Sequence, residues 1–536
     1  MQMRKTIFLV MLLALTTEMS TAATIEGDTT RRDRLNYKTL NFLSNPWSGT
    51  NNPVSLSFNQ VQTLAQATLL AHYERGGYHP VDGGAMQNDY SLDISGLKRI
   101  GNFSLSGNIK YSNIKDYSRR WNSTLYLTPL NPFVFGDSIR SDMTTEQFDL
   151  HAAAAYRFSD RVQAGLRLRY LTGSLSDQTD PRPKNNAMHF IITPGFFYRL
   201  SDSHALGSSL NFDIYRSSLT HVVINNYINN IYFLMRGMGD SQNFTTNDAL
   251  NYPRDYKGFR FGGSLQWQWD LSDAIGNMLE LSGATNSEKA TDGGSAYTYK
   301  GGDYKATTLG LYDRLSIGGS GRLRHNVSLR GSYNGDEGYW YYQRRMTDPD
   351  HSNRVYYEVL SKNKMHKSTR LAASAVYRLD ALDTEALPSW TVQGGVGLNY
   401  SDEKHFEEST SEQKYTLIDL AAEGTKYWRL RRLRLTTTAG GGYRFSVGDP
   451  TFASVRGKLL SQYTAPAFEY ATANTASVNA RIALDIPLRL YSTPTWLTVF
   501  AGGQWRIYSG EDSNKYSNAY EGDCRTLINI GASLTL

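Results

Sequence analysis

Apolar and polar residues alternate along most of this chain. The last segment shows the pattern most clearly, because from Ile528 it reads Ile-Asn-Ile-Gly-Ala-Ser-Leu-Thr-Leu. Successive side chains of a β-strand point to opposite faces, so one face of such a segment meets hydrocarbon or a core and the other meets polar surroundings. Similar alternating runs begin at Phe103, Val162, Leu323 and Leu433. The pattern therefore predicts many β-strands that are apolar on one face.

The connections between these strands alternate between short and long. Short turns are expected near Ser159-Asp160 and at 318–321, and long loops near 217–255 and 446–474. Bacterial outer-membrane barrels have short periplasmic turns and long outer loops in this order. A soluble β-sandwich also alternates, but no second layer that could cover the apolar face is apparent. The sequence thus predicts an all-β fold, a transmembrane antiparallel outer-membrane β-barrel.

We count about 18 strands, from near residue 61 to Leu536, with 16 strands as the alternative. An even number leaves both ends of the chain in the periplasm. Residues 338–362 are expected to form two strands that continue beyond the bilayer. The loop at 217–255 is expected to narrow the mouth of the barrel.

The N-terminus has the features of a secretory signal. Arg4 and Lys5 precede the apolar run TIFLVMLLAL, which is too short to span a membrane as a helix. Small residues precede cleavage positions after Ala22 or Ala23. The chain is therefore predicted to comprise a signal peptide at 1–22, a polar N-terminal segment at 23–60 and a barrel at 61–536, located in the cell outer membrane. The polar segment either plugs the lumen or forms a periplasmic tail.

Composition agrees with this architecture. The 536 residues include 46 glycines and 36 tyrosines but only 15 prolines, which suits closely packed strands and interfacial aromatic girdles. Cys524 is the one cysteine, so no disulfide can form within the chain. The formal net charge of +6 is modest, and the sequence contains no dense run of basic residues. Both observations argue against nucleic-acid binding.

Projection of the strands places a set of charged side chains inside the barrel. Arginines outnumber carboxylates there, and guanidinium groups in a low-dielectric wall favour anions. The alternative is that these arginines pair with inward carboxylates and only stiffen the wall. The candidate lumen residues are Arg167, Arg169, Arg260, Arg324, Arg330, Arg370, Arg378, Arg434, Arg444, Arg506, Asp419 and Glu423.

An aromatic run, Tyr339-Trp340-Tyr341-Tyr342, falls in a predicted outer loop. Exposed aromatic rings can stack on sugars or hold a protein partner, and these four residues are candidate binding residues. The alternative is that they belong to a girdle or to an extended hairpin.

The sequence does not favour an enzyme. The histidines are scattered, and adjacent residues such as His351-Ser352-Asn353 rarely form a hydrogen-bonded triad, because their side chains point apart. No spacing of metal ligands stands out, and no glycine loop that would cradle a phosphate follows a strand and opens a helix. We therefore expect no catalytic residue, no metal and no cofactor.

The signal peptide, the Asn45-Pro46 start, the tyrosine-rich strands and the β-strand at the very end resemble uncharacterised outer-membrane barrel proteins of Bacteroidota. The resemblance covers the whole mature chain and implies a Gram-negative outer-membrane location. No catalytic residues are assigned to that group, so none is carried over. Apolar Ile530, Leu534 and Leu536 preserve the C-terminal pattern by which barrel-assembly machinery recognises its substrates, although many barrels end in Phe or Trp.

Three functions follow as hypotheses. The first is a porin-like channel or uptake component for a polar, anionic solute, which moves by diffusion past the lumen arginines. The second is a partner-binding barrel whose outer loops hold a surface lipoprotein or a secretion component. The third is a lipid enzyme at the rim. In each case the outer surface of the wall contacts outer-membrane lipids.

Overall fold

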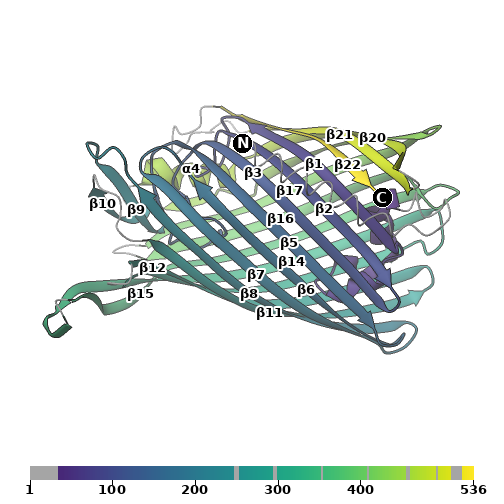
Figure 1. The fold of residues 1–536 in the computed structure, drawn as a ribbon, viewed down its shortest axis with the longest axis horizontal. Coiled ribbons are helices and arrows are strands. Elements are labelled where there is room, and N and C mark those ends of the chain that lie inside the picture. Colours follow the sequence, from purple (N-terminus) through teal and green to yellow (C-terminus); the bar gives the residue numbers. More distant parts are fainter. Residues whose placement is uncertain are drawn as a thin grey trace.

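The main element of the protein is one antiparallel sheet that closes on itself. The computed structural model describes residues 34–246, 253–293, 298–351, 354–406, 410–453, 459–490, 493–508 and 522–536. The first strand pairs with the second and also with the last, which closes the barrel (Figure 1). Within these ranges the sheet has 19 strands; the three-residue β19 pairs only with β17, so 18 strands form the wall. The predicted barrel and its strand number are confirmed.

The wall strands run up and down in chain order. Their bounds are β1 Thr63–Arg75, β2 Met86–Ile100, β3 Phe103–Arg119, β5 Ser141–Arg157, β6 Val162–Ser176, β7 Arg182–Arg199, β8 His204–Val222, β11 Arg254–Ser272, β12 Ile275–Gly293, β13 Thr298–Ile317, β14 Leu323–Asp348, β15 Arg354–Leu382, β16 Pro388–Phe406, β17 Thr410–Leu430, β18 Leu433–Ser446, β20 Thr475–Leu490, β21 Thr493–Tyr508 and β22 Cys524–Thr535. Short turns join them at the periplasmic end and long loops at the outer end.

The remaining elements are not part of the wall. They are α3 Tyr37–Ser44, η2 Pro46–Gly49, η3 Pro53–Phe58, β4 Phe135–Asp137, β9 Asn230–Gly237, β10 Asp240–Thr246, η4 Pro349–His351, β19 Thr451–Ala453, η5 Leu460–Thr464 and α4 Ala465–Thr472. β4, β9 and β10 form a second, three-stranded sheet. In the described part of the chain no helix is both long and apolar enough to cross a membrane.

Alternation of side chains decides which face of each strand meets lipid. On β11, Arg254 and Tyr256 are buried inside the barrel, whereas Phe259 and Phe261 are exposed on its outer surface. The same division holds on β8, where Tyr215 is buried and Ile214 is exposed. An exposed apolar outer surface around a closed sheet is the property of a barrel solvated by lipid.

The hairpin of β14 and β15 projects beyond the rest of the wall. These are the two longest strands, with 26 and 29 residues, and they pair as far as Asp348 and Arg354 (Figure 1, lower left). The two strands predicted at 338–362 are confirmed. Two β-bulges, after Gly338 and after Tyr342, interrupt the register of this extension.

Candidate transport path

The N-terminal segment, residues 34–59, lies inside the barrel near the short turns (Figure 1). Two Asn-Pro steps shape it. The side chain of Asn45 accepts a hydrogen bond from the backbone N–H of Trp47, and that of Asn52 accepts one from Val54, so each asparagine caps a short 3₁₀-helix that begins with proline. The capped turns keep the backbone compact enough to fit within the lumen.

Trp47 is the apolar anchor of this segment. Its indole is 1% exposed and packs against Phe58 and Phe197 at ring-centre distances of 6.0 and 5.1 Å. Its N–H donates to Gln268, 2.6 Å away. The wall carries Gly207 where the indole passes, and a Cβ at that position would collide with the ring. Glycine is thus required here for close approach of the segment to the sheet.

Polar contacts tie the same segment to strands around the barrel. The backbone N–H and the side-chain amide of Asn51 both donate to Glu280 on β12, at 2.9 and 2.7 Å. Arg314 on β13 donates to the carbonyl oxygens of Phe42 and Asn45 at 3.2 and 2.9 Å. Further contacts of this kind are Arg99 with the Ser57 and Asn59 carbonyls, Ser57 with Gln163, Asn52 with Gln266, and Asn36 with Arg434.

The outer mouth holds a second folded insert, which we call the outer plug: residues 121–137, with β4, and the hairpin of β9 and β10. Phe133 and Phe135 are 0% and 2% exposed and pack with Tyr232, Tyr304 and Trp340 in one core. Asn131-Pro132 repeats the local geometry of the N-terminal segment, because the Asn131 side chain accepts from the N–H of Phe133 at 3.0 Å. Its amide donates to Glu288 on β12 at 2.9 Å, which fixes the insert to the wall.

A buried ion pair supports the outer plug. Arg254 on β11 and Asp292 on β12 make two hydrogen bonds of 2.6 Å, and the guanidinium lies 5.4 Å from the ring centre of Phe135. The pair is fully enclosed, so loss of either partner would leave an uncompensated buried charge. Within β4, burial raises the pKa of Asp137 to about 7, although the backbone N–H of Ile139 donates to it and opposes the shift.

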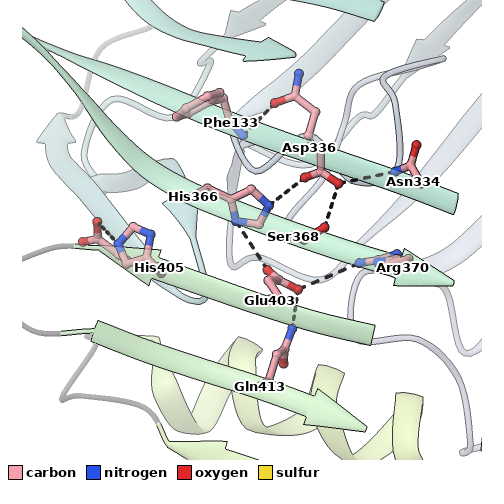
Figure 2. Close-up of polar contacts among 11 residues, drawn as sticks. Phe133, Asn334, Asp336, His366, Ser368, Arg370, Glu403, His405 and Gln413 are labelled. Carbon is pink, nitrogen blue, oxygen red and sulfur yellow. Dashed lines mark hydrogen bonds and ion pairs between the residues drawn. The ribbon is translucent and has the colours of Figure 1, made fainter. Parts of the chain in front are cut away.

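Figure 2 shows a polar cluster where the outer plug meets β14, β15 and β16. Nε2 of His366 lies 3.1 Å from Asp336, and Ser368 donates to the other oxygen of that carboxylate at 2.7 Å. Because the serine hydroxyl is bound to the carboxylate and not to the imidazole, these three residues do not form an activated nucleophile. Nε2 of His405 contacts Asp240 on β10 at 3.0 Å, so this cluster joins the wall to the β9–β10 hairpin.

The structure divides the predicted lumen arginines into two groups. Five contact an inward carboxylate: Arg169 with Asp149, Arg370 with Glu403, Arg378 with Asp380, Arg434 with Asp485 and Arg444 with Asp419. The other five, namely Arg167, Arg260, Arg324, Arg330 and Arg506, form no ion pair within 4 Å among the described residues. Arg260 and Arg330 are exposed, and Arg330 stacks on Tyr312 at 4.3 Å.

The two predicted lumen carboxylates also differ. Asp419 pairs with Arg444, whereas Glu423 accepts hydrogen bonds from Gln393 and Asn479 at 3.4 and 3.1 Å. Of the four aromatic candidates in the extended hairpin, Trp340 and Tyr341 are 2% and 8% exposed, Tyr339 is half-buried and Tyr342 is exposed. Trp340 therefore packs on the outer plug, below a guanidinium of Arg236 at 5.6 Å.

Several residues of this path were not singled out in the sequence. Arg481 on β20 faces inward, is exposed and stacks on Phe500 at 4.6 Å. In the sequence, Arg481 alternates with apolar Ile482, and this alternation indicates that Arg481 faces the lumen. Asn52-Pro53 and Asn131-Pro132 were also readable, as repeats of the Asn45-Pro46 step.

Two residues of the triplet His351-Ser352-Asn353, Ser352 and Asn353, lie outside the described residues. The predicted signal peptide also lies outside them. No group of three metal-ligating side chains occurs in the ranges that the structure describes.

Comparisons with solved structures return barrels of the outer membrane. The ferric preacinetobactin receptor BauA from Acinetobacter baumannii is 10% identical with a TM-score of 0.39, over 88% of this chain and 80% of that chain. The RagAB peptide importer is 7% identical with a TM-score of 0.40, over 88% and 86%. The monoaromatic hydrocarbon channel CymD is 10% identical with a TM-score of 0.31, over 91% and 92%.

No curated protein matches the sequence. A family model does match residues 53–536, which include the whole barrel and the second capped turn of the N-terminal segment. The chain belongs to this family, which is described as a family of unknown function (DUF6850).

Proposed function

We propose that this barrel takes up a polar, anionic solute across the outer membrane, and that residues 34–59 and the outer plug close its two ends. The observation that carries the proposal is the position of Arg260. On β11, Tyr256 donates to the outer plug through the Phe133 carbonyl, and Gln266 contacts the N-terminal segment through Asn52. Arg260 lies between these two contacts on the same inward face, exposed to the interior.

Arg330 and Arg481 extend this unpaired positive charge to other parts of the wall. Each stacks on an aromatic ring, which orients the guanidinium without neutralising it. A guanidinium in a low-dielectric wall attracts carboxylates and phosphates more strongly than it would in water. The interior therefore suits an anion that enters after one closure has moved.

The test is the reversal potential, in a planar bilayer under a salt gradient, of an opened parent that lacks 34–59 and carries Asp240→Asn to loosen the outer plug, compared with the same protein carrying Arg260→Gln/Arg330→Gln. The proposal expects anion preference in the opened parent and a shift towards zero selectivity in the variant. Arg344→Gln/Arg345→Gln on the projecting hairpin removes the same charge outside the lumen and serves as the control. Equal selectivity in all three proteins would reject an arginine-lined anion path.

One observation favours a second function, the binding of a surface partner. The β14–β15 hairpin projects beyond the wall and exposes Tyr342 and Tyr356. A surface lipoprotein could bind there while the lumen stays closed. Deletion of 343–358 would then abolish stoichiometric co-purification of that partner from outer membranes and leave bilayer conductance unchanged. Co-purification that survives the deletion would argue against this function.

A further inference from the structure

The outer surface of the barrel carries a groove of about 590 Å³ across β5, β6, β7, β8 and β11. Small outward side chains such as Thr172, Ser174 and Ser218 form its floor, and Phe148, Met188, Arg216 and Lys257 stand around them. The residues that alternate with these, including Tyr215, Ser217 and Tyr256, are buried on the inside. The groove therefore opens on the face of the wall that meets the membrane.

Register aligns two basic residues that line one end of this groove with a third that stands just beyond it on β12. Arg216 on β8 stands directly opposite Lys257 on β11, and Lys257 stands directly opposite Lys289 on β12. All three side chains are exposed, and none forms an ion pair within 4 Å with a described carboxylate. Directly opposed residues of adjacent strands are about 5 Å apart, and like charges at that spacing repel. Three cations in a row thus leave a demand for an anion.

Carboxylates do not meet this demand. Asp303 on β13 stands directly opposite Lys289, but it accepts hydrogen bonds from Lys362 and Tyr341 at 2.7 and 2.6 Å instead. Asp255 and Glu146 line the opposite edge of the groove, and Glu146 accepts hydrogen bonds from Tyr111 and Asn113 at 3.4 and 3.3 Å. Asp255 stands opposite Ser218 and Thr291, one row further from the membrane centre than Lys257. The basic row consequently faces the membrane side of the groove.

An apolar row borders the basic one on the side of the membrane centre. Ile214 and Phe259 stand opposite each other, two residues from Arg216 and Lys257, and are 43% and 52% exposed. Phe190 continues that row on β7. A molecule in this position meets cations at one end and a lipid-facing aromatic surface at the other, which is the polarity of a lipid.

We propose that this groove binds a phosphorylated lipid of the outer leaflet, with a phosphate on Arg216, Lys257 and Lys289 and acyl chains against Phe148, Met188 and Phe259. A phosphate carries more than one negative charge and several acceptor oxygens, so it can bridge neighbouring cations. The groove continues into the apolar surface, which a free phosphate would not need.

The test is a titration of the purified full-length protein with diphosphoryl lipid A, followed by native mass spectrometry. Dephosphorylated lipid A and phosphatidylethanolamine are the comparison lipids. The proposal expects the diphosphoryl form to bind more tightly than both. The double variant Arg216→Gln/Lys257→Gln should bind diphosphoryl lipid A about thirtyfold more weakly. This factor corresponds to the loss of the attraction that two basic groups near a lipid surface provide.

Lys305→Gln/Lys367→Gln is the matched control, because these two lysines also face outward near the outer end but each stands opposite Glu337. It should bind within twofold of the parent. Lys289→Gln alone provides a second, milder variant with an intermediate loss. Equal binding of the dephosphorylated lipid, or equal losses in the groove and control variants, would overturn the proposal. Displacement of the lipid by equimolar inorganic phosphate would also overturn it, by assigning the groove to free phosphate.

Discussion

His366 and His405 stand directly opposite each other on β15 and β16, and each contacts a carboxylate from a different part of the molecule. His366 contacts Asp336 of the wall, and His405 contacts Asp240 of the β9–β10 hairpin (Figure 2). Arg236 also bonds Asp240, at 2.7 Å. This pair of wall histidines thus contacts a carboxylate of the wall through His366 and a carboxylate of the outer plug through His405.

The contact at Asp240 is expected to hold the outer plug in the mouth. Asp240→Asn removes the charge that both His405 and Arg236 face, so the hairpin should leave the mouth more often. With a protein that lacks 34–59 as the parent, so that the N-terminal segment does not mask the effect, we expect more frequent current openings in single-channel recordings and an unchanged melting temperature of the barrel. His325→Ala, at a half-buried histidine that contacts the Tyr377 hydroxyl far from the outer plug, is the control. A variant as quiet as the parent would show that this contact does not retain the plug.

The shifted pKa of Asp240 predicts how the stability of this contact changes with pH. Burial would raise that pKa, but the hydrogen bonds and charges of His405 and Arg236 outweigh burial and lower it. A depressed folded-state pKa contributes stability above the ordinary value near 3.8, and this stability is lost as pH falls through the depressed value. Openings of the parent should therefore increase only in strong acid, and Asp240→Asn should abolish that increase.

Asp137 should give the outer plug the opposite pH dependence, with stability that falls as pH rises. Burial raises its pKa to about 7, so the folded outer plug favours the protonated carboxyl. Between about pH 4 and pH 7 the folded state binds a proton that the unfolded segment does not, and stability falls as pH rises. Hydrogen exchange of β4 and β9, corrected for intrinsic rates, should be faster at pH 8 than at pH 5.5. Asp137→Asn should remove the difference; an unchanged pH dependence would assign it to another group.

Trp47→Ala should release the N-terminal segment. Truncation of a fully buried tryptophan costs about 3–5 kcal/mol, which is large for a segment held otherwise by scattered hydrogen bonds. Limited proteolysis should then cut within 34–59, while the barrel keeps the gel mobility of a folded protein. Trp267→Ala, at an exposed outward indole on β11, should leave the segment protected. Gly207→Val should reproduce the Trp47→Ala phenotype from the wall side, because its side chain would occupy the position of the indole.

The barrel could be predicted from sequence because alternation is a local property. Ile214 and Tyr215 differ in environment for no reason other than the two-residue period of a strand. The same rule predicts that the side chain of Arg434 points into the lumen. Its partner, Asp485, is on β20 and is found only when the strand register is known. Four of the ten predicted anion-binding arginines have such partners on a neighbouring strand, which the sequence does not reveal, whereas Arg378 pairs with Asp380 two residues along its own strand.

The aromatic run at 339–342 shows a second limit. A regular period places Trp340 and Tyr341 on opposite faces, yet both are buried. Trp340 packs in the core with Phe133, whereas Tyr341 donates to Asp303 at 2.6 Å and lies under the ammonium groups of Lys300 and Lys362. The groups that cover Tyr341 come from the neighbouring strands β13 and β15, so the alternation within one strand does not predict its burial.

The central claim is that residues 34–59, together with the outer plug, close a barrel that would otherwise conduct. The most direct measurement is the conductance, in planar bilayers, of the full-length protein and of a variant that lacks 34–59, each checked for a folded barrel by gel mobility. We expect a closed parent and, once Asp240→Asn is added to loosen the outer plug, a truncated variant with steady current that reverses on the anion side of zero under a salt gradient. A folded variant that stays silent, even when Asp240→Asn is added to loosen the outer plug, would contradict the account.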